Sequence, residues 1–179
     1  GFTSLTCQQS RAENAAMLRA YENLLRPVIV RFGGKVIKSI GDALLVTFRS
    51  PTDGVRCAMA LQDAAFEYSR DKTPQTQLRI RVAVNLGEVR VDRGDVFGEP
   101  VNLASRIEGI TPADEIYYSE SVYLAMNKAE VPSELIGPQT LKGIPEAVNV
   151  YRVPRFKATR LVASGEPNGD ARLAYPFGG

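Results

Sequence analysis

The sequence predicts a single α+β domain in which helices cover one face of a largely antiparallel sheet. The chain has 179 residues, little more than one domain at roughly 150 residues each. It is 44% hydrophobic and 23% charged, as is usual for a globular protein with a large core. Helical and strand patterns follow one another in a mixed order, which is typical of α+β domains.

The first part of the chain predicts a helix followed by a hairpin. The helix is expected over residues 12–32, with a bend at Pro27, because apolar residues recur there at steps of three and four. Two strands over residues 35–40 and 43–48 then fold back on each other around Gly41-Asp42. The apolar residues of the helical stripe are Met17, Tyr21, Leu24, Val28 and Phe32.

The middle of the chain predicts a second helix and a charged strand. Ser50 and Pro51 are start signals for a helix over residues 52–68. A strand follows over residues 78–84, with Arg79 and Arg81 on one cationic face.

The remaining elements are shorter. We expect a strand near residues 88–91, a helix over 100–108, a strand over 116–119, a helix over 120–127, and a hairpin formed by 139–142 and 148–153. Residues 155–179 contain six glycines or prolines and predict a linker or a docked extension.

Composition excludes several kinds of function. The chain has no histidine, which removes Ser-His-Asp hydrolysis, Cys-His proteolysis and His-ligated zinc. Its net charge is +2, from 22 basic and 20 acidic residues that are well mixed, so we expect no nucleic-acid partner. Two cysteines are too few for a disulfide framework and favour a reducing compartment.

No apolar run approaches the roughly 18 residues needed to span a bilayer. We therefore expect a cytoplasmic domain, although the full-length protein could be anchored in a membrane by another segment.

Asp42, at the expected hairpin tip, has two interpretations. Aspartate is a common turn former because it bonds its own main chain. The alternative is a magnesium ligand, since Mg²⁺ takes one or two carboxylates together with substrate phosphates.

Asn102 and Arg106 lie four residues apart on one face of the helix expected after Pro100. One interpretation is that they belong to a polar face of the helix that contacts only solvent. The other is that the Asn102 amide and the Arg106 guanidinium together bind a phosphate ester.

Four blocks of the sequence together resemble the catalytic domain of bacterial-type class III adenylate and guanylate cyclases. They are residues 1–5 (GFTSL), 33–43 (GGKVIKSIGDA), 94–106 (GDVFGEPVNLASR) and 141–144 (LKGI). The resemblance covers about residues 1–154 in the family's order, and the tail lies outside it. The Gly-Gly-Asp/Glu-Glu-Phe hairpin that marks diguanylate cyclases is absent from the sequence.

The resemblance implies a ferredoxin-like sheet and a homodimer with active sites at its interface. The implied reaction converts ATP into 3',5'-cyclic AMP and pyrophosphate, assisted by two divalent metal ions (Mg²⁺ or Mn²⁺). The domain would be the output end of a longer protein with an upstream regulatory domain.

The resemblance also implies roles for individual residues. Asp42 would bind metal, Arg106 would stabilise charge on the α-phosphate, and Asn102 would orient the ribose. Arg81 and Lys142 would hold the β- and γ-phosphates, and the backbone of Gly1, Phe2 and Thr3 would cradle the triphosphate.

Lys38 and Asp95 match the family positions that contact the purine. A lysine only donates hydrogen bonds and a carboxylate only accepts them. Adenine offers an acceptor at N1 and a donor at N6, whereas guanine offers the reverse. This pair therefore favours ATP, and the alternative for Lys38 alone is an exposed strand lysine.

The sequence departs from the family pattern at its start. The family's other metal-binding aspartate lies three positions before Gly1, on the first strand of the sheet, so we expect that strand upstream. Its absence here keeps open a second interpretation, a catalytically silent cyclase-like module that binds nucleotide or dimerises.

Overall fold

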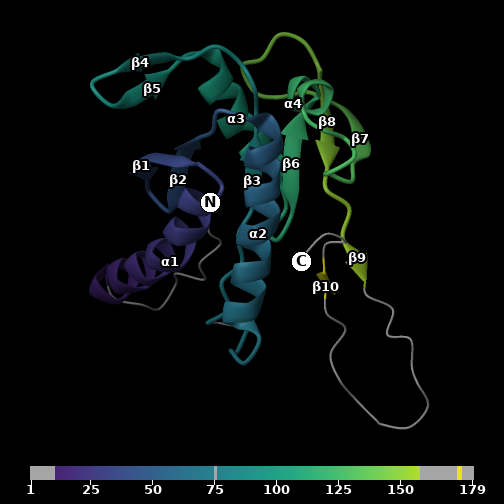
Figure 1. Cartoon of the computed structure of the whole chain (residues 1–179). Helices are drawn as coiled ribbons and strands as arrows, with labels where there is room; N and C mark the ends of the chain where they lie inside the picture. The colour runs from purple at the N-terminus through teal and green to yellow at the C-terminus, as the bar shows by residue number, and fades with distance from the viewer. Residues whose placement is uncertain (1–10, 75, 158–172, 175–179) are drawn as a thin grey trace, which may run out of the picture.

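The computed structural model describes residues 11–74, 76–157 and 173–174 (Figure 1). The predicted mixed order of helices and strands is confirmed. In chain order the elements are α1 (Arg11–Arg31), β1 (Lys35–Ile40), β2 (Ala43–Thr47), α2 (Pro51–Ser69), β3 (Val82–Val84), β4 (Arg90–Asp92), β5 (Asp95–Phe97), α3 (Glu99–Ile110), β6 (Ile116–Ser119), α4 (Glu120–Ala125), β7 (Glu134–Gln139), β8 (Val148–Arg152), β9 (Phe156–Lys157) and β10 (Leu173–Ala174).

The described strands form one larger sheet and three strand pairs. The larger sheet has the order β3-β6-β8-β7, in which β3 and β6 are parallel and the other neighbours antiparallel. The pairs β1-β2, β4-β5 and β9-β10 are each antiparallel. In Figure 1 the β1-β2 hairpin lies to the left of α2, and the strands β6, β8 and β7 of the larger sheet lie to its right.

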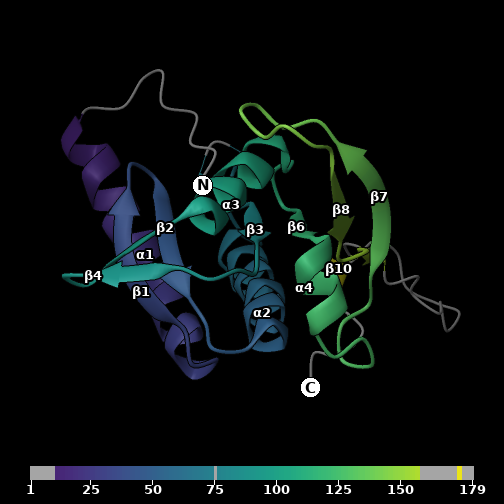
Figure 2. The ribbon, with the colours of Figure 1, turned by 90° about the horizontal axis from the view of Figure 1, so that it is seen from above.

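Helices lie on both faces of the larger sheet. Val82 and Val84 of β3 pack into the cluster that contains Val55 of α2. Ala83, between them, faces the opposite way and packs with Ile107 of α3. The α+β class is therefore as predicted, but α3 covers the face that the sequence interpretation left open, because β3 is apolar on both faces (Figure 2).

Local chemistry explains where the long helices begin and end. The Ser50 hydroxyl accepts a hydrogen bond from the Asp53 amide (3.2 Å), and Pro51 fits the first turn of α2. The helix α1 runs through Pro27 and ends before Gly33, whose φ of +73° is the left-handed backbone that a glycine readily adopts.

Three strand predictions were wrong in their bounds. The strand expected over residues 78–84 is β3 alone, because side chains of α2 bind the backbone before it: Ser69 Oγ accepts from the Leu78 amide (2.7 Å) and Gln62 Nε2 donates to the Ile80 carbonyl (3.0 Å). The strand expected near 88–91 is instead the β4-β5 hairpin.

The strand expected over residues 139–142 is β7, which ends at Gln139. Residues 141–144 form a turn in which the Ile144 amide donates to the Leu141 carbonyl (3.0 Å). Within the described part of the chain, no helix has the length and apolar character needed to cross a bilayer.

Candidate functional site

The β1-β2 hairpin carries two of the predicted site residues. Its turn is tight because Gly41 has a φ of +61°, and Asp42 follows directly, half-buried. The pairing of β1 with β2 shifts register between Val36 and Lys38, which is the mark of a bulge. Bulges bend a strand and re-aim side chains, and Lys38 lies directly after this register shift.

Lys38 forms an ion pair with Asp95 of β5, with 2.5 Å between Lys38 Nζ and Asp95 Oδ2. The other carboxylate oxygen accepts a hydrogen bond from the Val96 amide at 2.8 Å. The Lys38 ammonium also lies 5.7 Å from the centre of the Phe97 ring. The two side chains are 41% and 29% exposed, so a donor and an acceptor stand side by side at the surface.

This contact changes the acidity of Asp95. The hydrogen bond from Lys38, and then that from the Val96 amide, hold the pKa of the Asp95 carboxyl below its ordinary value. Asp95 is therefore an ionised acceptor throughout the neutral range.

The helix α3 positions Asn102 and Arg106 one turn apart. It follows Gly98, whose φ is +139°, and has a proline in its first turn. Asn102 is exposed, while Arg106 is partly buried. Arg106 Nε is buried and has no hydrogen-bond partner among the described atoms. A buried donor of this kind is costly unless an acceptor reaches it, which fits an anionic group.

Lys142 lies in the turn between β7 and β8, close to α3. Its neighbour Leu141 is buried against Ile107, the residue after Arg106. Lys142 itself is exposed. The packing of Leu141 therefore holds this lysine near the second half of α3.

Arg81 does not form the free cationic surface that the sequence predicts. Its Nε donates to Glu108 Oε1 of α3 at 2.6 Å, and Arg79 pairs with Asp114 at 2.6 Å. The expected cationic face of the strand is thus neutralised by carboxylates. Sequence reasoning missed Glu108, although the demand of a half-buried arginine for an anionic partner was a usable signal.

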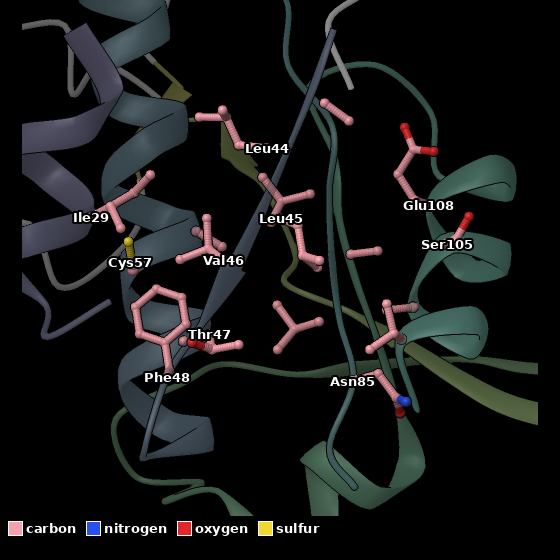
Figure 3. Close-up of a pocket in the computed structure, with 18 of the residues that line it drawn as sticks. Ile29, Leu44, Leu45, Val46, Thr47, Phe48, Cys57, Asn85, Ser105 and Glu108 are labelled. Atoms are coloured by element: carbon pink, nitrogen blue, oxygen red, sulfur yellow. The ribbon is translucent and has the colours of Figure 1, made fainter. Parts of the chain in front are cut away.

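A cavity of about 550 Å³ lies between β2 and β3 (Figure 3). Of the predicted site residues, Asp42 and Arg81 line it. Lys38, Asp95, Asn102, Arg106 and Lys142 are not among its described lining residues. The structure thus separates a cavity with Asp42 from a surface group around Lys38 and Asp95.

No group of three or more Asp, Glu, Cys or His side chains capable of holding a metal occurs among the described residues. Asp42 supplies a single carboxylate. This fits the way Mg²⁺ is usually held, by one or two carboxylates together with substrate phosphates and water. Gly1, Phe2 and Thr3, which were predicted to cradle the triphosphate, lie outside the described residues.

Comparison with known sequences points to one family. A family model described as the adenylate and guanylate cyclase catalytic domain matches residues 1–154. A serine/threonine-protein kinase, pkn2, of Myxococcus xanthus is 39% identical over 170 residues, which are 95% of this chain and 20% of that protein. A putative adenylate cyclase 3 of Rhizobium meliloti is 28% identical over 84% of this chain and 26% of its own length.

Comparison with solved structures points the same way. An adenylate/guanylate cyclase/hydrolase from Silicibacter pomeroyi superimposes with a TM-score of 0.75 at 26% identity, covering 86% of this chain and 92% of that one. The adenylyl cyclase CyaB from P. aeruginosa gives a TM-score of 0.70 at 22% identity, covering 86% and 88%, and so supports the fold alone. The chain spans about a fifth to a quarter of the two curated relatives described above.

Proposed function

Because the chain belongs to the adenylate and guanylate cyclase catalytic domain family, we propose that it converts ATP into 3',5'-cyclic AMP and pyrophosphate. The observation that carries the choice of ATP is the ion pair between Lys38 and Asp95. Lys38 and Asp95 are 57 positions apart in the sequence. Their ion pair places an ammonium, which only donates hydrogen bonds, beside a carboxylate, which only accepts them, and both side chains are partly exposed. The name of the Rhizobium meliloti relative, a putative adenylate cyclase, agrees with this choice.

The pair matches the hydrogen-bonding edge of adenine. Lys38 would donate to N1, and Asp95 would accept from the N6 amino group. Guanine in the same pose would face Lys38 with its N1–H donor and Asp95 with its O6 acceptor. Each mismatch leaves a polar group unpaired, at a cost of about 1–3 kcal/mol.

The reaction needs groups that hold the ribose and the phosphates in line. The 3'-oxygen forms a bond to the α-phosphorus, the bond from that phosphorus to the β-phosphate oxygen breaks, and the hydroxyl proton passes to solvent. Asn102 would orient the ribose, and Arg106 would stabilise charge on the α-phosphate. The unpartnered Arg106 Nε supports this role, because a phosphate oxygen would satisfy it.

The β- and γ-phosphates would be held by Lys142, Arg81 and the backbone of Gly1, Phe2 and Thr3. Lys142 is exposed and available for this contact. Arg81 would first have to release Glu108. Asp42 would hold metal, and two divalent ions, when bound, supply Lewis-acid stabilisation of the charge that develops on the phosphates.

The proposed enzyme works as a homodimer with sites shared between two chains. We place the catalytic domain at residues 1–154, with 155–179 as a linker or docked extension, in a longer cytoplasmic or membrane-anchored protein under an upstream regulatory domain.

The first test measures substrate choice. Full-length protein is incubated with equal ATP and GTP and with Mn²⁺, and the cyclic product is identified by mass spectrometry. Cyclic AMP is expected in large excess. Lys38→Ala is expected to lower kcat/KM for ATP by roughly 10- to 100-fold, from the loss of one well-placed hydrogen bond to a charged group. Lys35→Ala, at an exposed lysine of the same strand, is the matched control and should leave the rate unchanged.

The second test measures sharing of sites. Asp42→Ala and Arg106→Ala chains are each expected to be inactive, and their mixture to regain part of the activity. No recovery in mixtures shown to exchange subunits would contradict shared sites.

A catalytically silent nucleotide-binding module is the second candidate. It is favoured by the ion pair of Arg81 with Glu108, which occupies a residue proposed to hold phosphate. Nucleotide binding by a demonstrated dimer of the full-length protein, with no cyclic product, would select it.

A further inference from the structure

The side chain of Asn85 joins three parts of the fold at the end of β3. Asn85 comes directly after β3, is half-buried, and lines the cavity between β2 and β3 (Figure 3). Its Nδ2 donates to the Pro100 carbonyl in the first turn of α3 at 2.9 Å. Its Oδ1 accepts from Ser119 Oγ, a buried hydroxyl at the end of β6, at 2.6 Å. One amide group therefore links β3, α3 and β6.

The partners fix the orientation of this amide. A carbonyl oxygen only accepts hydrogen bonds, so the NH₂ group of Asn85 faces Pro100 and its oxygen faces the serine hydroxyl, which can donate. The network continues through Ser121, whose Oγ lies 2.8 Å from that of Ser119 and donates to the Leu86 carbonyl at 3.2 Å. An ionised aspartate at position 85 would keep the acceptor and lose the donor. The site is thus specific for an amide.

The first turn of α3 depends on contacts from outside the helix. Gly98, the residue before α3, has no side chain that could cap the free amides of a helix start. The Pro100 ring packs closely on Gly87, where an added Cβ would lie 2.9 Å from Pro100 Cβ. Pro100 is therefore held in two ways, through its carbonyl by Asn85 and through its ring by Gly87.

The two halves of α3 are anchored differently. The second half contains Ile107, which is fully buried among apolar side chains. The first half carries Asn102, which is exposed and lies two residues after Pro100. An exposed side chain has little packing of its own, so its position depends on the backbone turn that bears it. Asn85 binds that turn.

We propose that Asn85 is a positioning residue for the cyclase reaction, because its bond to the Pro100 carbonyl holds the first turn of α3 where Asn102 can orient the ribose. This inference rests on the proposed function. Asn85 acts through Pro100 and does not itself contact the nucleotide. Since orientation of the reacting groups is realised in the rate, loss of the bond should lower kcat and leave KM nearly unchanged.

The test compares steady-state rates of the full-length protein and its variants with ATP and Mn²⁺. Asn85→Asp removes the donor and keeps the acceptor. It should lower kcat by roughly 10- to 100-fold with KM for ATP within about twofold, as expected for a misplaced catalytic group. Asn85→Ala also gives up the serine contacts and should lower kcat to a similar extent, because the donor is the part that acts.

Asn149→Ala is the matched control. Asn149 is another half-buried asparagine, and its Nδ2 donates at 3.2 Å to Glu120 Oε1 of α4 rather than to α3. This variant should leave kcat unchanged. Thermal unfolding of every variant gives its Tm, and the rates are compared at a temperature well below the lowest of these values.

A double-mutant cycle measures whether Asn85 acts through Asn102. In an Asn102→Ala background, Asn85→Asp should lower kcat further by less than about twofold, because the side chain that it positions is already gone. In a Lys38→Ala background the same substitution should keep its full effect, since Lys38 is proposed to contact the base. A purely structural role of Asn85 would lower kcat equally in both backgrounds.

The outcomes separate this inference from the proposed function. An unchanged kcat in folded Asn85→Asp and Asn85→Ala, or equal effects in the Asn102→Ala and Lys38→Ala backgrounds, would overturn the inference alone. A loss confined to a raised KM would also overturn it, because Asn85 would then serve binding. Wild-type protein that makes no cyclic product would overturn the proposed function, and this inference with it.

Discussion

The β1-β2 hairpin and the four-stranded sheet are built differently. In the sheet, Ile116, Tyr118 and Val150 are fully buried, and backbone pairing is continuous from β3 to β7. In the hairpin every residue of β2 is only half-buried, and four of the six residues of β1 are exposed. The two parts are held together through packing of α1 against α2 rather than by paired strands.

The residues of the candidate site and the residues of the buried core thus lie in different parts of the molecule. Lys38 and Asp42 lie on the hairpin, and Asp95 lies on the β4-β5 pair that contacts it. The packed sheet contributes the buried core. The residues proposed to read the base therefore belong to the less buried part of the molecule, where a ligand can reach them.

The largest effect is expected in the buried sheet. Ile116→Ala removes a fully buried side chain of β6 and should lower the free energy of unfolding by about 2–5 kcal/mol. Val46→Ala, in the half-buried β2, should cost only about 1 kcal/mol. Urea denaturation of both variants measures the difference, and equal losses would contradict the comparison.

The next effect is expected where the hairpin meets α1. A Cβ at Gly34 would lie 2.6 Å from Phe48 Cε1 and 2.7 Å from Ile29 Cγ2. Gly34→Ala should therefore destabilise the fold by about 1–3 kcal/mol through overpacking. Gly109→Ala is the control, because a Cβ there meets nothing within 4 Å and a helical alanine is favoured over glycine. The Tm should fall for Gly34→Ala and should stay unchanged or rise for Gly109→Ala.

A smaller effect is expected on acidity. Because Lys38 holds the pKa of Asp95 below its ordinary value, Lys38→Ala should raise that pKa, whereas Lys35→Ala should not. The folded value lies below the unfolded one, so the contact stabilises the fold above about pH 4 and is lost as the pH falls through the folded value. Carboxyl NMR titration measures the pKa directly. If the pKa of Asp95 is unchanged in Lys38→Ala, Lys38 is not the cause of its lowering.

The smallest effect on stability is expected for the exposed ion pair on strands β7 and β8. Arg152 bonds Glu134 across β8 and β7 with both side chains exposed. Arg152→Ala should leave urea stability at neutral pH nearly unchanged, since exposed ion pairs contribute little. The pKa of Glu134, which Arg152 lowers, should rise. A large loss of stability would mean that the sheet depends on its surface as well as on its core.

Local chemistry made part of the fold predictable. The Gly41-Asp42 turn and the start of α2 at Ser50-Pro51 depend on residues next to one another, and both predictions are confirmed. The strand β5 was missed because it has only three residues and begins with a charged one, so its sequence shows no clear periodicity. The start of β3 was placed too early because Ser69 and Gln62, from a distant helix, bind the backbone there.

The candidate site was less predictable from composition and spacing. Lys38 and Asp95 are 57 residues apart, so only the family resemblance related them, and the ion pair itself was not foreseen. The pairing of Arg81 with Glu108 was also unforeseen, because it depends on how α3 packs across the face of β3. Long-range contacts of this kind carry no local signal.

The absent side chain of Gly34 has a mechanical consequence. Its amide donates to the Ile29 carbonyl at 2.9 Å, and the Phe48 ring occupies the space where a Cβ would be. The contacts at Gly34 thus join the end of α1 to both ends of the hairpin. A shift of the end of α1 would therefore also displace the hairpin that carries Lys38 and Asp42.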